Sequence, residues 1–226
     1  MYVDKQTARE QAQAAYQFSS WVQKWWRRLT FKAPPCKTVF LDTETTGLHP
    51  GPEAAEIIEI AMVTEYADGR VEHWVTKVSP QHIDTAHPKA LEINGFAPEL
   101  WEGSPTPKEI SPLVADKLRG AVVVGHNVKF DLKFVQTMLI DTGTALHVDE
   151  LESIDTQNLA RTHLKPLGLK SISLVNCRRW FGWSTVGAHT ALVDAEDCRR
   201  LYHKLKKPRP YQKRLWAFFG LRRMAR

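Results

Sequence analysis

Residues 39–48 read VFLDTETTGL, a short apolar run that ends in two carboxylates and then a turn. The run over 38–42 is typical of a buried β-strand. Because residues two apart in a strand point to the same face, Asp42 and Glu44 are expected to lie side by side. Two like charges held that close raise one another's pKa unless a cation lies between them, and hard divalent cations prefer oxygen ligands. Taken alone, such a pair is more often just a polar strand end before a turn.

The segments that follow predict more strands and then helices. Residues 57–66 and 71–78 are expected to form a hairpin through Ala67, Asp68 and Gly69, and the apolar run 121–124 predicts a strand buried on both faces. Helices are expected at 88–94, around 110–118, at about 130–139, and at 155–164, 171–181 and 191–205. A chain of 226 residues therefore fits one α/β domain with modest extensions, in which a strand meander precedes helices packed around one more strand.

Net charge, cysteine spacing and apolar runs indicate what kind of partner and compartment to expect. The formal net charge of +6 favours a polyanionic partner, although many basic proteins merely carry a solvated surface. The three cysteines, Cys36, Cys177 and Cys198, have neither paired nor metal-site spacing, so they are expected to be reduced thiols. The sequence has no run of about eighteen apolar residues, and its first residues are polar where a signal peptide needs an apolar stretch. A cytoplasmic protein is expected, and a membrane partner is disfavoured.

Two further segments place an acid beside an expected helix start. HNVKFD, at 126–131, follows the buried strand, and ligands of open α/β sheets bind at the carboxyl ends of strands. Asp131 is also simply an acid that the helix dipole favours there. HTALVD, at 189–194, puts His189 on a loop and Asp194 one turn inside a helix. Five helical residues rotate by about 140°, so the two side chains converge only if His189 lies outside regular helix.

Together and in this order, these segments resemble the DEDDh (DnaQ-like) exonuclease family, which includes the proofreading epsilon subunit of bacterial DNA polymerase III. The resemblance spans roughly residues 38–205. It rests on VFLDTETTGL, EIIEIA at 56–61, ALEINGF at 90–96, GHNVKFD at 125–131, IDTQNLAR at 154–161 and HTALVDA at 189–195. It implies a ribonuclease-H-like α/β fold, a mixed sheet flanked by helices.

The resemblance also implies the chemistry of a site. Asp42, Glu44, Asp131 and Asp194 would be the metal-binding carboxylates, and His189 the general base. Four acids are more negative charge than one pocket tolerates, whereas two Mg²⁺ or Mn²⁺ ions about 3.5–4 Å apart would neutralise them and hold a scissile phosphate. A histidine, with an ordinary pKa near 6.5, can accept the proton of an attacking water near neutral pH.

Substrate and direction follow from the resemblance as well. It implies removal of nucleoside 5′-monophosphates from single-stranded DNA 3′ ends, in replication or repair. Thr45, Thr46 and Leu48 match the pocket of the terminal nucleotide, formed by backbone groups and an apolar wedge, and Asn127 is expected beside the substrate. Such contacts tolerate any base. RNA 3′-end trimming is the runner-up, and a nuclease fold serving as a binding subunit of a polymerase assembly is a third hypothesis.

Residues 1–36 are expected to form an amphipathic helix, at 4–29, and a proline linker ahead of an exonuclease domain at 37–206. The helix carries Trp21, Trp25 and Trp26. They are expected to pack on the domain, with docking on another protein second and lying on a membrane surface third.

Residues 207–226 form a basic, aromatic tail. Gln212, Leu215, Phe218 and Phe219 match the pattern Q-x-x-L-x-x-F-F, which resembles the sliding-clamp-binding box of archaeal and eukaryotic replication proteins. A basic amphipathic helix that covers the domain, contacts DNA phosphates or binds a polymerase subunit would need the same residue types. The tail is therefore expected to tether the enzyme to a clamp or a polymerase subunit.

Overall fold

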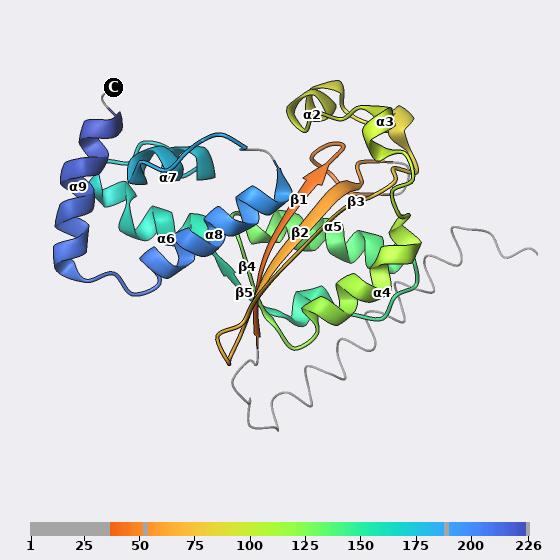
Figure 1. The fold of residues 1–226 in the computed structure, drawn as a ribbon, viewed down its shortest axis with the longest axis horizontal. Coiled ribbons are helices and arrows are strands. Elements are labelled where there is room, and N and C mark those ends of the chain that lie inside the picture. Colours follow the sequence, from red (N-terminus) through yellow and green to blue (C-terminus); the bar gives the residue numbers. More distant parts are fainter. Residues whose placement is uncertain (1–36, 52–53, 188–189, 225–226) are drawn as a thin grey trace, which may run out of the picture.

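The computed structural model describes residues 37–51, 54–187 and 190–224. The expected helix at 4–29 with its three tryptophans, Cys36 and His189 lie outside the described residues. Figure 1 shows the arrangement of the rest, with one sheet between two groups of helices. The predicted α/β architecture, a mixed sheet flanked by helices, is confirmed.

The sheet has five strands in the order β3-β2-β1-β4-β5. The first three pair antiparallel, whereas β4 pairs parallel with β1, and β5 parallel with β4. Gly69 lies in the predicted hairpin turn at φ +88°, a conformation that glycine adopts readily, and its N–H donates to the Tyr66 carbonyl. The strands are β1 (Lys37–Thr45), β2 (Ile57–Tyr66), β3 (Val71–Lys77), β4 (Val122–Gly125) and β5 (Glu152–Asp155).

Capping residues set where the helices begin. Thr106 accepts a hydrogen bond from Glu109 N while the Glu109 carboxylate accepts from Thr106 N, so α4 starts three residues before the predicted point. Ser173 caps α7 by accepting from Asn176 N. The helices are α2 (Pro88–Ile93), α3 (Pro98–Trp101), α4 (Pro107–Leu118), α5 (Val128–Asp141), α6 (Thr156–His163), α7 (Leu174–Phe181), α8 (Ala191–Leu205) and α9 (Pro210–Met224).

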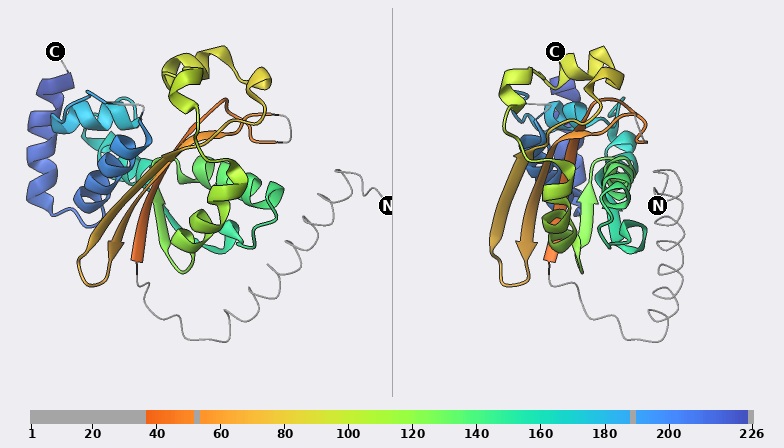
Figure 2. Two further views of the ribbon diagram at one scale, coloured as in Figure 1. Left: turned by 45° about the vertical axis from the view of Figure 1, so that its right-hand side comes forward. Right: turned by 90° about the vertical axis from the view of Figure 1, so that its right-hand side faces the viewer.

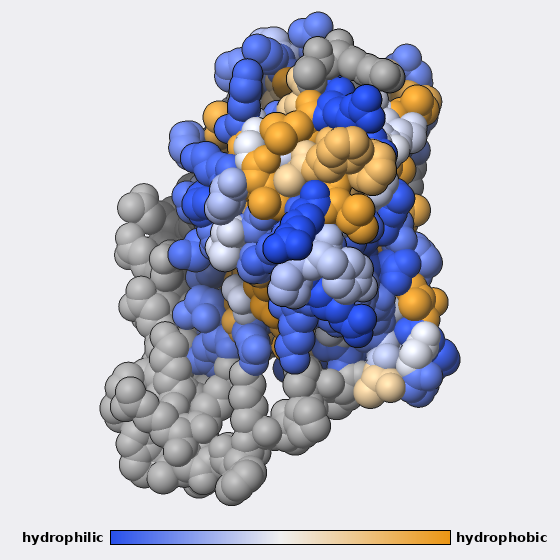
Figure 3. Space-filling view, turned by 90° about the vertical axis from the view of Figure 1, so that its left-hand side faces the viewer, coloured by the Kyte–Doolittle hydropathy of each residue, from blue (hydrophilic) through white to orange (hydrophobic). Residues whose placement is uncertain are grey.

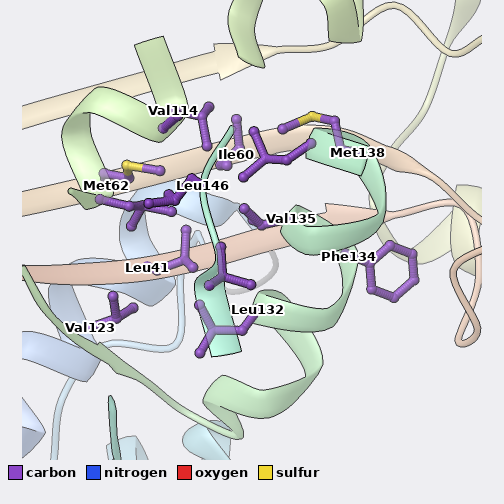
Figure 4. Close-up of a cluster of buried hydrophobic side chains, with 14 of the residues drawn as sticks. Leu41, Ile60, Met62, Val114, Val123, Leu132, Phe134, Val135, Met138 and Leu146 are labelled. Atoms are coloured by element: carbon purple, nitrogen blue, oxygen red, sulfur yellow. The ribbon is translucent and has the colours of Figure 1, made fainter. Parts of the chain in front are cut away.

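Two apolar clusters fix helices on opposite faces of the sheet. On one face, strand residues such as Leu41, Ile60 and Val123 pack against Val114 of α4 and Val135 of α5 (Figure 4). On the other face, a smaller cluster joins the sheet to the first half of α8, through Phe40, Ala61, Val124, Ala191 and Ala195. Figure 2 shows α5 and α8 on either side of the strands. The sheet is therefore held between α5 and α8, the two helices that carry Asp131 and Asp194.

The tail packs against the rest of the molecule. A third cluster brings α6, α7 and the end of α8 together, and Trp216 and Met224 of α9 lie against it. Trp216 meets Phe181 edge-on with ring centroids 5.4 Å apart, and Arg223 Nη1 donates to the Trp180 carbonyl at 3.2 Å. The tail residues 210–224 thus form a 15-residue helix with one face on α7.

One strand was absent from the prediction. Residues 152–155 form β5, which pairs with β4 through Asp155 and Gly125, so the helix expected from 155 begins at Thr156 instead. Asp155 is the N-cap of α6, and its carboxylate accepts from Gln157 N at 2.8 Å. A four-residue strand with the sequence ESID has neither apolar alternation nor length to announce it.

No helix in the described part of the chain is both long and apolar enough to cross a membrane. Among the described residues, Cys177 and Cys198 are buried free thiols, as predicted for them.

Candidate active site

The site begins where β1 extends past β4. The last Cα pair between the two strands is Phe40 with Val124, so Asp42, Thr43 and Glu44 lie beyond the ladder. Leu41 belongs to the cluster on the α5 face and Phe40 to the cluster on the α8 face. By strand alternation Asp42 and Glu44 share the α8 face, as the sequence predicted, and Thr43 points towards α5.

Asp131 reaches this segment from α5. It is 3% exposed, and its Oδ1 accepts hydrogen bonds from Thr43 N at 3.0 Å and from Thr43 Oγ1 at 2.8 Å. The Thr43 N–H has no β4 partner at this point, so the carboxylate takes the place of a strand. These hydrogen bonds join two residues that are 88 positions apart in the sequence, at the carboxyl end of β1.

Asp194 reaches the site from the first turn of α8. Its Oδ1 accepts from Arg178 Nη2 at 2.6 Å. The start of α8 is tied to the sheet by Glu59, whose Oε1 accepts from Ala191 N at 3.2 Å. Glu59 lies directly across from Glu44 in the β1–β2 register. Sequence reasoning missed Glu59 and Arg178; the strand alternation within EIIEIA was the available signal for Glu59.

The pKa values of the acids show that they influence one another. Burial raises the pKa of Asp42 well above its ordinary value, and the charges of Asp131, Asp194 and Glu44 raise it further. Burial, followed by the charges of Asp194, Glu59 and Asp131, raises the pKa of Glu44 to about 8. Burial likewise raises the pKa of Asp131 to about 7, against the lowering effect of its Thr43 hydrogen bonds. The four predicted carboxylates therefore share one electrostatic environment.

This donor set fits a hard divalent cation. Carboxylate oxygens are the preferred ligands of Mg²⁺ and Mn²⁺, and a divalent charge would offset the repulsion that adds to burial in raising the pKa values of Asp42 and Glu44. One oxygen of Asp131 and one of Asp194 are already engaged by Thr43 and Arg178. Within residues 37–51, 54–187 and 190–224, no three His, Cys, Asp or Glu side chains already stand in an arrangement able to hold an ion.

The predicted nucleotide-pocket residues divide into buried and exposed ones. Thr45 Oγ1 donates to the Gly47 carbonyl, and Thr46 Oγ1 accepts from Glu56 N at 2.9 Å, so both hydroxyls are used within the fold. The Thr46 backbone is used too, since its N–H donates to Glu56 and its carbonyl accepts from His87. Leu48, in contrast, is 74% exposed. Leu48 is the member of this group that is open to a ligand.

Asn127 stands between β4 and α5 in a strained conformation. It is exposed, and at φ +76° it is the non-glycine residue with positive φ in the described part of the chain. Asp155 Oδ1 accepts from Asn127 N at 3.0 Å, as well as from Gln157 N, and so holds this turn. The turn directs α5 so that Asp131, four residues later, faces β1.

A cavity of about 400 Å³ lies apart from the acids. It is lined by the second half of α5, by the start of α4 and by the loop before β2, through Phe134, Met138, Pro107, Ala55 and Ile57 among others. None of the four carboxylates lines it. The four acids therefore lie at the open edge of β1 and not in this cavity.

Comparison with known proteins agrees with this geometry. The model of the RNase_T family, described as "Exonuclease", matches residues 39–202. The chain is 30% identical over 163 residues to the DNA polymerase III subunit epsilon of Treponema pallidum, covering 71% of this chain and 72% of that protein. It is 33% identical over 165 residues to the PolC-type DNA polymerase III of Thermotoga maritima, covering 73% of this chain but only 11% of the polymerase. The chain thus spans about a tenth of that larger relative.

Solved structures share the fold. E. coli exonuclease I in complex with a dT13 oligonucleotide superimposes with a TM-score of 0.62 at 19% identity, over 80% of this chain and 43% of that one. A zinc-bound form of the exonuclease I complex with single-stranded DNA gives a TM-score of 0.64 at 20% identity, over 82% and 43%. The predicted ribonuclease-H-like fold and the resemblance to DnaQ-like exonucleases are confirmed.

Proposed function

Since this chain belongs to the exonuclease family whose model matches residues 39–202, we propose that it is a divalent-metal-dependent 3′→5′ exonuclease that removes nucleoside 5′-monophosphates from single-stranded DNA. One observation carries the proposal. Four carboxylates from β1, α5 and α8 gather at the open edge of β1, where burial and then the charges of the other three acids raise the pKa of Asp42. Such a cluster is disfavoured in a folded protein unless a cation compensates it.

Each residue has a distinct part in the proposed reaction. Asp42, Glu44, Asp131 and Asp194 would hold two Mg²⁺ or Mn²⁺ ions, which when bound supply an activated water and charge stabilisation of the leaving 3′ oxygen. Thr43 keeps Asp131 oriented by two hydrogen bonds. His189 would accept the proton of the attacking water. Leu48 would pack against the terminal base, a contact that tolerates any base.

DNA is the proposed polymer because the relatives are replication proteins. Both similar polymerase III proteins act on DNA by name, and the exonuclease I structures hold DNA oligonucleotides. The net charge of +6 suits either nucleic acid. RNA 3′-end trimming is therefore the alternative that the decisive experiment must separate.

Matched single-stranded DNA and RNA oligonucleotides, each labelled at the 5′ end, test the proposal. A 3′→5′ exonuclease shortens the labelled strand in single-nucleotide steps, and EDTA should stop it while Mg²⁺ or Mn²⁺ restores it. A strand blocked by phosphorothioates at its 3′ end is the control. Faster turnover of RNA would assign the alternative substrate. Release of the labelled 5′ nucleotide first would contradict the polarity, and binding without turnover would favour the binding-subunit hypothesis.

We further propose that the exposed side of α9 binds a polymerase subunit or sliding clamp. Leu215, Phe218 and Phe219 are 52%, 56% and 47% exposed, whereas Trp216 between them packs on Phe181. Figure 3 views this side of the molecule and shows apolar side chains gathered among polar ones. Residues 207–224 contain six lysines and arginines and no acid, namely Lys207, Arg209, Lys213, Arg214, Arg222 and Arg223, so the partner surface should be apolar and acidic.

The double variant L215S/F218S tests this surface, because both side chains are exposed and their loss should not disturb the fold. Co-elution with a polymerase subunit or clamp should be lost while turnover of short oligonucleotides stays unchanged. Leu113→Ser, an exposed leucine on α4, is the matched control. Retained co-elution of the double variant would contradict the proposed interface.

A further inference from the structure

Arg178 is a buried cation beside the acid cluster. Its side chain is 0% exposed, and it lies on α7, outside every motif that predicted the site. Nη2 donates to Asp194 Oδ1 at 2.6 Å, and Nε donates to Asp197 Oδ2 at 2.5 Å. Nη1 has no hydrogen-bond partner among the described residues. Because burying a guanidinium is costly unless it is paired, the two carboxylates account for its presence there.

The geometry makes Asp197 the anchor of this arginine. Asp194 and Asp197 are three residues apart on α8, so their side chains lie on one face of the helix. Asp197 is 5% exposed, and its other oxygen accepts from Arg200 Nη1 at 2.7 Å. Both Asp197 oxygens are thus engaged, whereas the described hydrogen bonds of Asp194 involve Oδ1 alone. Arg178 is held on one side and presents Nη2 to Asp194 on the other.

We propose that Arg178 is a positioning residue for the metal site: it holds Asp194 Oδ1 and leaves Oδ2 as the oxygen that Asp194 offers to a metal ion. The inference rests on the proposed function, since it requires that Asp194 bind metal. Hydrogen-bonded partners of ligating carboxylates orient them in this way, and losing such a partner typically costs about 10–100-fold in metal affinity or activity.

The alternative is that Arg178 competes with the metal for the acids. Its charge, however, is already matched by Asp197 as well as by Asp194. Its lowering effect on the pKa of Asp42 is smaller than the raising effect of each of Asp131, Asp194 and Glu44. Because its charge is compensated in this way, the guanidinium changes the net charge that a metal ion would meet at the acid cluster only a little. Its effect on the orientation of Asp194 is therefore the larger one. The two alternatives predict changes of opposite sign in metal affinity.

Arg178→Gln, compared with Arg200→Gln, separates them. Arg200 also pairs with Asp197 but is half exposed and makes no described contact with Asp194. Mn²⁺ binding is measured directly, from the free Mn²⁺ signal in electron paramagnetic resonance, and the Mn²⁺ dependence of oligonucleotide hydrolysis is measured alongside. R178Q should raise the Mn²⁺ dissociation constant by about 10–100-fold, and R200Q should leave it unchanged. Equal effects of the two variants, or tighter binding by R178Q, would overturn the proposal.

Asp197→Asn covers the case in which R178Q does not fold. It keeps Arg178 and the shape of its anchor but removes the anchor's charge, so Mn²⁺ binding should weaken in the same direction by a smaller factor. Normal Mn²⁺ affinity of folded D197N would then overturn the proposal. Wild type is the reference for the proposed function itself: absence of Mn²⁺ binding and hydrolysis there would refute the metal-dependent nuclease, whereas a functional wild type with an unaffected R178Q refutes only the role of Arg178.

Discussion

At the scale of single residues, Asp42 is the acid at which the charges of the site converge. Its pKa is raised by burial and by three other carboxylates. Asp42→Ala should therefore lower nuclease turnover by at least about 100-fold, because a proposed metal ligand is lost, while relieving repulsion in the metal-free protein. The thermal midpoint measured in EDTA should not fall. Asp116→Ala, at an exposed acid on α4, should leave turnover intact. Substantial turnover by D42A would refute the assignment of the site.

His189 is the residue whose proposed role depends on proton transfer. His189→Ala should lower turnover by roughly 10²–10⁴-fold, the usual contribution of a general base, with little effect on binding of the DNA end. The acid limb of the pH–rate profile should also disappear, since no imidazole remains to be protonated. His73→Ala, on β3, is the control. An acid limb shared by wild type and H189A would show that another group is the base.

At the scale of elements, the contact between α9 and α7 depends on one glycine. A Cβ on Gly220 would overlap the Trp180 ring, and Trp180 is fully buried. Gly220→Val should therefore displace α9 and destabilise the protein by about 1–3 kcal/mol, as overpacking does. Phe218→Ser, on the exposed side of the same helix, should leave the urea midpoint unchanged. A stability of G220V equal to that of wild type would show that α9 does not depend on this contact.

Elements with strong periodicity were predictable, and those defined by their partners were not. The bounds of α8, Ala191–Leu205, were predicted correctly because its apolar residues recur at helical spacing. The four residues of β5 form a strand only because β4 lies beside them. The start of α4 at Pro107 is a different case, because Thr106 and Glu109 cap each other and this local signal was overlooked.

The site shows the same division. Asp42, Glu44, Asp131 and Asp194 belong to recognisable motifs, and the structure brings them together. Nothing in the sequence indicated that Arg178 would meet Asp194, because the contact joins α7 to α8 through tertiary packing. His189 lies outside the described residues, so its role stays a prediction.

At the scale of the whole molecule, the raised pKa values of the acid cluster make the free energy of unfolding depend on pH. The Glu44 carboxyl keeps its proton up to about pH 8 in the folded protein, whereas its ordinary pKa is 4.5. Between those values the folded state binds more protons than the unfolded state, so stability falls as the pH rises. Burial lowers the pKa of His126, which acts in the opposite direction, and raises the pKa of the Cys198 thiol. A test of Glu44 must therefore cancel these shared contributions.

Glu44→Gln cancels the contributions of His126 and Cys198, because it keeps the shape of the side chain and removes only the proton equilibrium of Glu44 and its effect on the neighbouring acids. In EDTA, the unfolding free energy of wild type should fall relative to that of E44Q by up to about 1.4 kcal/mol per pH unit between pH 5 and 8, and the difference should level off above pH 8. Urea titrations at each pH measure it. Saturating Mn²⁺ should flatten the curve, since metal ligands bind deprotonated. A difference independent of pH in EDTA would show that the Glu44 carboxyl is already ionised without metal, and that the acid cluster is less tightly gathered than its geometry indicates.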